Sequence, residues 1–171
     1  MTEYDSIEGR AWVFGDNVDT DQIIQGRYLT CLDYSKMAKH TLEIPRPEFA
    51  DEVNKGDVIV AGKNFGGGSS REEAPQVLKE VGVGCVVAES FARIFYRNAI
   101  NIGLPIMQLD EASSIPDGSV VEISLESAQL TIKDSGTTLS GNPLPALMKK
   151  ILYAGGAIPW FRSSREKEAL S

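Results

Sequence analysis

The chain has 171 residues, of which 42% are hydrophobic and 24% charged, with 16 glycines and 8 prolines. This length and composition predict one globular domain with a substantial core and exclude a disordered or fibrous chain. Seventeen basic residues against 24 acidic ones leave a net charge of -7, which argues against general binding to nucleic acid or to an anionic membrane surface.

The first part of the chain alternates short apolar runs with polar segments. We expect a lead-in at residues 1–10, a buried strand at 11–15 and a loop at 16–29. A weakly helical segment is expected at residues 33–43 and an exposed connection at 44–57. The loop is dense in Asp and closes on a glycine. The exposed connection carries two prolines and many charges.

A strand–helix–strand–helix–strand pattern follows. Its strands are expected at residues 57–61, 84–88 and 104–109, and its helices at 71–82 and 90–102. Short links predict parallel strands joined by right-handed crossovers. Residues 119–127 and 129–135 then predict an antiparallel hairpin, residues 145–156 a closing helix and residues 163–171 a flexible end. The predicted fold class is α/β, with a mainly parallel central sheet and an added β-hairpin.

Candidate metal ligands are scarce. The chain has two cysteines, Cys31 and Cys85, and one histidine, His40, too few for a disulfide framework or a complete zinc or iron–sulfur site of its own. The polar, acidic start has no apolar core of a signal peptide, and no apolar run approaches the roughly 20 residues of a membrane helix. We expect a reducing, cytoplasmic location.

The strongest local signal is a glycine-rich loop with two serines and an arginine, GGGSSREE at residues 66–73. Its glycines let a ligand approach the main chain. The spacings Ser69–Glu72 and Ser70–Glu73 match capping boxes, so we expect a helix start that binds an anion with help from Arg71. A well-capped helix after a flexible turn is the plain alternative. The loop matches neither a P-loop nor a GxGxxG motif.

Ser69 lacks the partners of a hydrolase serine. The only histidine lies in a distant segment, and no G-x-S-x-G elbow is present. If Ser69 does chemistry, a helix N-terminus and a nearby cation are the groups that could stabilise its alkoxide.

Two further polar groups have open interpretations. The segment DNVDTD at residues 16–21 resembles the start of an EF-hand, but Arg27 stands where a bidentate Glu is required. It is either a solvated turn or a pair of acids that orient an arginine or hold a substrate hydroxyl. Arg93, Arg97 and Asn98 lie on the second predicted helix, and either they are exposed charged and polar groups or an arginine among them turns toward the serine loop.

Three long motifs occur in a specific order: GDNVDTDQIIQGRYL, NFGGGSSREEAP and AESFARIFYRNAINIGLPI. Together they resemble the small subunits of isopropylmalate isomerases, the separately made swivelling domains of the aconitase superfamily, from about Ala11 to Phe161. The resemblance implies a single swivelling domain of α/β/α-sandwich type over residues 1–171. It also implies a large partner subunit that holds a 4Fe-4S cluster, with this chain inactive alone. Self-association of the isolated chain is left open.

The resemblance also implies roles for individual residues. Ser69 corresponds to a catalytic base that removes a proton next to a carboxylate, and Arg71 and Ser70 correspond to contacts with substrate carboxylate and oxyanion. Asp21 corresponds to an acid that organises the pocket. The implied reaction is the isomerisation of 2- and 3-isopropylmalate in leucine biosynthesis, by dehydration and rehydration. Many relatives carry a cysteine where this chain has Gly67, which we expect to leave activity intact.

The implied specificity segment is Tyr28-Leu29-Thr30-Cys31. Relatives acting on homoaconitate resemble YLRT, where an arginine pairs with an extra carboxylate. Thr30 offers no cation, and Cys31 with Leu32 suits a small branched alkyl group. Isopropylmalate is therefore expected as the dicarboxylate substrate. The alternatives are the small subunit of a homoaconitase or a dimethylmalate dehydratase, and a non-catalytic module that binds anions.

Overall fold

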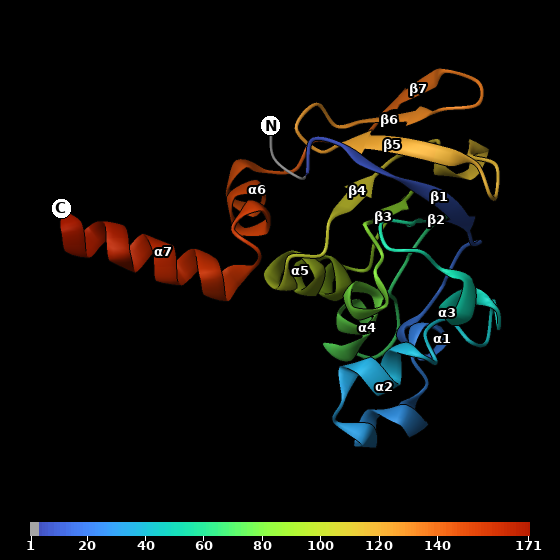
Figure 1. Ribbon diagram of the computed structural model, residues 1–171, viewed down its shortest axis with the longest axis horizontal. Helices are drawn as coiled ribbons and strands as arrows, with labels where there is room; N and C mark the ends of the chain where they lie inside the picture. The colour runs from blue at the N-terminus through green and yellow to red at the C-terminus, as the bar shows by residue number, and fades with distance from the viewer. Residues whose placement is uncertain (1–3) are drawn as a thin grey trace.

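A computed structural model describes residues 4–171 and contains one seven-stranded sheet in the order β4-β3-β2-β1-β5-β6-β7 (Figure 1). Its strands are β1 (Ile7–Val13), β2 (Val58–Ala61), β3 (Cys85–Ala88), β4 (Ile106–Gln108), β5 (Val120–Ser124), β6 (Gln129–Ile132) and β7 (Thr137–Ser140). Strands β1 to β4 pair in parallel, whereas β5, β6 and β7 add to β1 in antiparallel fashion. The fold is a mixed α/β domain whose sheet is parallel on one side, which confirms the predicted fold class.

Short helices connect and flank these strands. They are α1 (Thr20–Ile23), α2 (Tyr34–Ala38), α3 (Phe49–Glu52), α4 (Glu73–Val81), α5 (Arg93–Ile102), α6 (Ala146–Tyr153) and α7 (Ala157–Leu170), with 3-10 turns η1 (Gly26–Cys31) and η2 (Ala112–Ser114). Helices α4 and α5 are the crossovers from β2 to β3 and from β3 to β4. Figure 1 shows α7 projecting away from the body of the domain.

Burial follows the pairing of the strands. Every residue of β2 and β3 is buried, as expected of parallel strands covered on both faces, whereas β5 and β6 alternate between buried and more exposed positions. The parallel strands thus form the rigid centre from which the loops before α4 and α5 emerge. In the described part of the chain no helix is long and apolar enough to cross a membrane.

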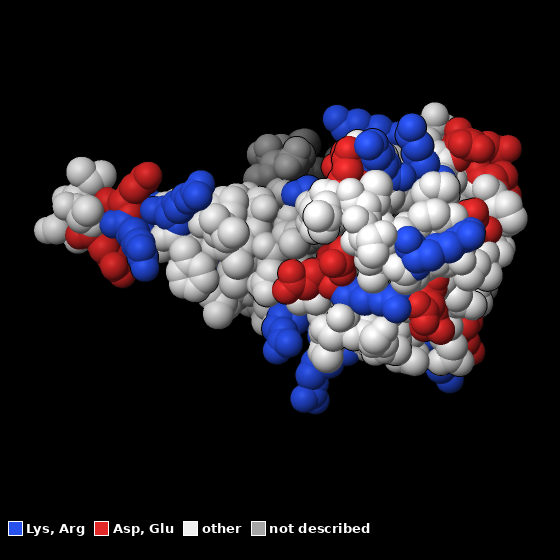
Figure 2. All heavy atoms as spheres, turned by 90° about the horizontal axis from the view of Figure 1, so that it is seen from below, with Lys and Arg blue, Asp and Glu red and all other residues white. Residues whose placement is uncertain are grey.

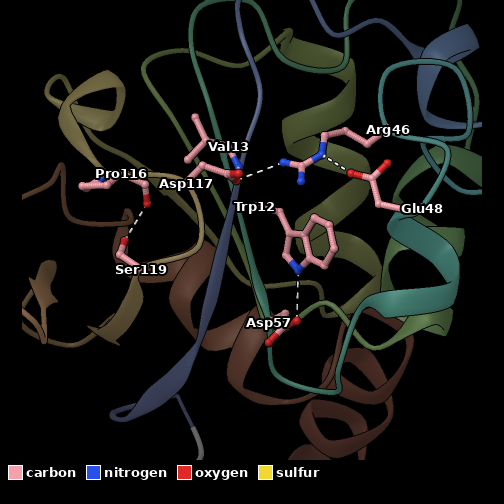
Figure 3. A network of polar contacts seen from close by, with 8 residues as sticks. All are labelled: Trp12, Val13, Arg46, Glu48, Asp57, Pro116, Asp117 and Ser119. Atoms are coloured by element: carbon pink, nitrogen blue, oxygen red, sulfur yellow. Dashed lines mark hydrogen bonds and ion pairs between the residues drawn. The ribbon is translucent and has the colours of Figure 1, made fainter.

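A polar network ties the start of the sheet to its neighbours (Figure 3). Asp57 is 4% exposed and accepts hydrogen bonds from the Trp12 indole at 3.0 Å and from the Arg10 backbone N–H at 3.1 Å. Arg46 lies over the Trp12 ring, 4.8 Å from its centroid, and donates to Asp117 at 2.9 Å. These contacts fix β1 against β2 and against the connection that precedes α3.

The structure confirms the three parallel strands, their two helical crossovers and the β5–β6 hairpin. It corrects several other expectations. Strand β1 begins at Ile7, inside the expected lead-in, because residues 7–10 pair with β5. The expected loop contains α1, which Asp19 caps. The expected exposed connection contains α3, because Phe49 is fully buried against Trp12.

Two more differences concern the second half of the chain. Strand β7 was not predicted, because its residues are mostly exposed and carry no apolar alternation. Residues 163–170, expected as part of a flexible end, are helical within α7, which contains no buried residue. Residues 1–3 of the expected lead-in lie outside the described residues.

Candidate functional site

The glycine-rich loop leaves β2 and turns sharply beneath α5. Gly66 and Gly68 have φ of +82° and +86°, a region that favours glycine. A Cβ at Gly66 would lie 2.3 Å from Cγ of Phe95, whereas a Cβ at Gly68 would meet nothing closer than 3.6 Å. Gly66 is therefore required by both backbone conformation and packing, and it brings the loop close to α5.

The segment around α1 holds the other side of this loop. The Thr20 N–H donates to the Gly67 carbonyl at 2.9 Å, and the Thr20 hydroxyl donates to the Ser69 carbonyl at 2.9 Å. Thr20 is 2% exposed. Ser69 and Ser70 are exposed, and their hydroxyls form no hydrogen bond with the described residues. The backbone at Ser69 is thus fixed while its hydroxyl remains free for a ligand.

Arg71 is bound on the side of the loop nearest α1. Its Nη1 lies 2.5 Å from Oδ1 of Asp21 and donates to the Ile24 carbonyl at 3.1 Å. The Arg71 side chain is only 18% exposed, whereas that of Asp21 is 63% exposed. A Cβ at Gly26 would lie 3.4 Å from Nη2 of Arg71. Since a guanidinium has five N–H donors, Arg71 keeps donors for an anion after these contacts.

A small pocket of about 190 Å³ lies between the serine loop and the start of α5. Eleven residues line it: Thr20, Gly66, Gly68, Ser69, Ser70, Arg71, Ala92, Arg93, Ile94, Phe95 and Asn98. Two arginines, two hydroxyls and an amide at a partly apolar wall suit a small acid with an apolar part. Figure 2 shows acidic and basic side chains interspersed on the face turned to the viewer, with neither sign of charge covering it.

The sequence predicted part of this arrangement. The pocket contains Ser69, Ser70 and Arg71, and Asp21 pairs with Arg71 as expected for an acid that orients an arginine. Arg93 and Asn98 line the pocket beside the serine loop, which favours the interpretation that an arginine of this helix faces that loop, whereas Arg97 is not among the lining residues. Thr20, Ile94 and Phe95 were missed as site residues. The only signal for Thr20 was its place between two aspartates.

The predicted capping boxes are wrong. Helix α4 begins at Glu73, and its N-cap residue, Glu72, makes no side-chain cap. Ser69 and Ser70 precede that cap and belong to the loop, because Thr20 holds the Ser69 carbonyl. The helix start that borders the pocket is therefore that of α5, whose first residues line it together with Arg71.

The segment Tyr28–Cys31 lies in η1, which starts beside Arg71 but does not line the pocket. Tyr28 and Leu29 are half-buried against the core, and Thr30 and Cys31 are exposed. The structure does not place any of these four residues in contact with Ser69, and their role in substrate binding stays a prediction.

A metal cluster does not fit the described residues. They include no group of three His, Cys, Asp or Glu side chains placed to hold a metal ion. Cys85 is buried in β3, and this burial raises the pKa of its thiol, while Cys31 is exposed in η1. We therefore assign no step of a reaction to a cluster held by this chain.

The fold and the site together define the class of protein. It is a mixed α/β domain that carries a loop with two serines and an arginine after a parallel strand. The aconitase C-terminal domain model matches residues 12–112. The chain is 55% identical over 157 residues to the 3-isopropylmalate dehydratase small subunit 1 of Methanopyrus kandleri, covering 90% of this chain and 91% of the relative. It is 53% identical to the methanogen homoaconitase small subunit of Methanothermobacter thermautotrophicus, covering 89% and 88%.

The fold has a close counterpart among solved structures. The crystal structure described as 3-isopropylmalate dehydratase from Methanocaldococcus jannaschii superposes with a TM-score of 0.92 at 43% identity, covering 96% of this chain and 98% of that one. The chain belongs to the aconitase C-terminal domain family.

Proposed function

We propose that this chain is the small subunit of a two-subunit hydro-lyase that interconverts 2- and 3-isopropylmalate in leucine biosynthesis, in the cytoplasm. The relatives with that subunit name, at 55% and 51% identity, support the class of reaction. One observation carries the assignment of the site: Arg71, which pairs with Asp21 at 2.5 Å, lines the same small pocket as Ser69, whose hydroxyl is free.

Three residues of the pocket, together with Asp21, have a part in the proposed reaction. The remaining donors of Arg71 bind a substrate carboxylate, and Ser70 adds a hydrogen bond to it. Ser69, as an alkoxide favoured by the nearby guanidinium groups, removes the proton from the carbon next to that carboxylate. The electron pair of the C–H bond forms the alkene as the hydroxyl leaves the neighbouring carbon, takes up a proton and departs as water; a Lewis acid in the large subunit would assist this departure. In the reverse sense, water loses a proton and adds its hydroxyl to the carbon that Ser69 had deprotonated, and Ser69 gives its proton to the neighbouring carbon. Asp21 positions Arg71.

The large subunit is the proposed partner and the proposed holder of the 4Fe-4S cluster. Ser69 and Ser70 are exposed here, and a base that works as an alkoxide needs a site from which water is excluded. We propose that the large subunit closes over the serine loop and η1. The isolated chain would then supply only part of the active site and would not turn over substrate on its own.

The proposed substrate is an alkylmalate, with Tyr28, Leu29, Thr30 and Cys31 facing its alkyl arm. Thr30 offers no charge to a third carboxylate, which would cost several-fold in affinity for a tricarboxylate. The relative named as a methanogen homoaconitase small subunit makes a tricarboxylate the second candidate, followed by dimethylmalate.

The test is reconstitution with a large subunit of the same organism that carries its cluster. Isopropylmalate, dimethylmalate and the homocitrate-type tricarboxylates are assayed side by side by the absorbance of the alkene. We expect turnover of isopropylmalate in the mixture and none with either subunit alone. Preference for a tricarboxylate would overturn the argument from Thr30. No turnover of any substrate by an assembled complex with an intact cluster would favour a module that only binds anions.

A further inference from the structure

A cluster of four side chains lies beside the pocket and has no part in the proposed chemistry. The Glu43 carboxylate accepts a hydrogen bond from the Tyr28 hydroxyl at 3.3 Å and contacts Nδ1 of His40 at 3.1 Å. Arg27 Nη2 lies 3.9 Å from the same carboxylate. One carboxylate thus joins two residues of η1 to the segment that follows α2.

Ring contacts reinforce the same connection. The Tyr28 and His40 rings stack with centroids 3.8 Å apart and an angle of 7° between their planes. The Arg27 guanidinium lies over the Tyr28 ring, 4.7 Å from its centroid. Burial and the hydrogen bond with Glu43 raise the pKa of Tyr28, which agrees with a phenol that stays protonated as donor to the carboxylate.

The turn η1 is otherwise held by Tyr28 and Leu29, which pack half-buried against the core. It contains no fully buried residue, and it ends at Leu32, which is 90% exposed with φ of +56°. Glu43, by contrast, follows Leu42, which is fully buried and donates its N–H to the Ile23 carbonyl at 2.9 Å. Glu43 is therefore attached to the core, and its contacts add a polar connection from the core to η1.

The start of η1 lies against a residue of the pocket. Arg71 donates to the carbonyl of Ile24 and lies against Gly26, the first residue of η1, which itself does not line the pocket. The contact of Gly26 with Arg71 is therefore the structural link between η1 and a substrate carboxylate bound at Arg71.

We propose that Glu43 is a positioning residue for substrate selection, which holds η1 beside Arg71 through Arg27, Tyr28 and His40. This inference rests on the proposed function for the identity of the substrate, but not for the order of η1. Glu43 does not touch the reacting atoms, so its loss weakens binding of the alkyl arm and leaves the proton transfer at Ser69 in place.

The first experiment needs no activity. Amide hydrogen exchange in the full chain is compared between the wild type, Glu43→Ala and Glu43→Gln, with Glu80→Gln as a matched control on the exposed face of α4. We expect exchange over residues 26–32 to rise about tenfold in Glu43→Ala, less in Glu43→Gln, which keeps one acceptor oxygen, and to stay unchanged in the control. Unchanged exchange in Glu43→Ala would overturn the proposal.

The second experiment uses the complex with the large subunit. For Glu43→Ala we expect the KM for isopropylmalate to rise about tenfold, with kcat within about a factor of two and a smaller rise for a malate that carries only a methyl arm. A fall in kcat at constant KM, or equal rises for both substrates, would contradict a role in holding the alkyl arm. If the wild-type complex turns over no dicarboxylate, the proposed function fails, and the exchange experiment still decides the role of Glu43 in η1.

Discussion

The hydroxyl of Thr20 donates to the backbone carbonyl of Ser69 at 2.9 Å, across 49 positions of sequence. Thr20 is buried and lines the pocket, but its side chain points its hydrogen at the main chain of the loop and not at a ligand. The Ser69 hydroxyl is free, and the backbone of the serine loop is held by this bond, by the Thr20 N–H bond to Gly67 and by the Gly66 N–H bond to the Val18 carbonyl.

Thr20→Val removes this hydrogen bond and keeps the shape of the side chain. A base displaced by a fraction of an ångström loses rate steeply, so we expect kcat of the complex to fall on the order of 10²-fold, with little change in KM. Thr20→Ser restores the donor and most of the rate. A Thr20→Val enzyme with normal kcat would show that the loop is held in place by other contacts.

The glycines of the loop differ in what they tolerate. Gly66→Ala places a Cβ 2.3 Å from the Phe95 ring at φ of +82°, so we expect a loss of several kcal/mol in the free energy of unfolding. Gly68→Ala has space and meets only the unfavourable φ, with an expected loss of about 1–2 kcal/mol. Urea denaturation of both variants gives the comparison. Equal losses would contradict the packing argument.

Gly67 is the loop position at which the resemblance to the small subunits implies a cysteine in many relatives. Its φ is not positive, and a Cβ there would lie 2.8 Å from Nδ2 of Asn64, an exposed side chain that donates to Asn17 Oδ1 at 3.2 Å and has to shift slightly. We expect Gly67→Cys to fold normally and to keep turnover within about threefold of the wild type, since Ser69 and Arg71 do not depend on this position. Thermal melting and the alkene assay test the two parts. A large loss of turnover would indicate that the loop needs the freedom of glycine here.

Asp57 is a buried carboxylate with three donors, the Trp12 indole and the N–H groups of Arg10 and Asn54. Asp57→Asn turns an NH₂ group toward these donors, and we expect a loss of about 2–4 kcal/mol in the free energy of unfolding. Asp134→Asn, at an exposed position, is the control and is expected to change it by less than about 0.5 kcal/mol. A loss of similar size in both variants would show that the network in Figure 3 adds no stability.

Asp117 is a carboxylate whose protonation is expected to lower the stability of the protein at acid pH. Burial acts to raise the pKa of Asp117, but the Val13 N–H and the Arg46 guanidinium outweigh it and hold that pKa below its ordinary value. A lowered pKa contributes stability above the carboxyl's value in the unfolded chain, and the contribution is lost as pH falls through the folded value. We expect Asp117→Asn to lower Tm at pH 7 and to flatten its decline below pH of about 4. An unchanged decline would assign acid denaturation to other carboxylates.

Sequence patterns predicted the parts of the fold that depend on local periodicity. The buried runs at β2, β3 and β4 and the amphipathic pattern of α4 carry their own signal. Helix α3 carries none, because four residues are too few for a period, and the burial of Phe49 follows from its tertiary contacts with Trp12 and Phe14.

The candidate site likewise has a part that local sequence patterns predict and a part that they do not. Ser69, Ser70 and Arg71 were predicted because they adjoin one another in a glycine-rich loop. The contact of Thr20 with Ser69 and the cluster around Glu43 join segments that are distant in sequence. No local sequence pattern predicts such pairs. The expected capping boxes failed because α4 begins only at Glu73, so that Ser69 and Ser70 lie before its N-cap residue.

The central claim is that Ser69 is the base of a reaction completed by a second subunit, and Ser69→Ala in the reconstituted complex tests it most directly. Assembly is followed by size exclusion, and turnover of isopropylmalate by alkene absorbance. We predict normal assembly and a fall in kcat of several orders of magnitude, with Ser127→Ala, an exposed serine of the β5–β6 link, unaffected. Unchanged turnover in a fully assembled Ser69→Ala complex would contradict the account.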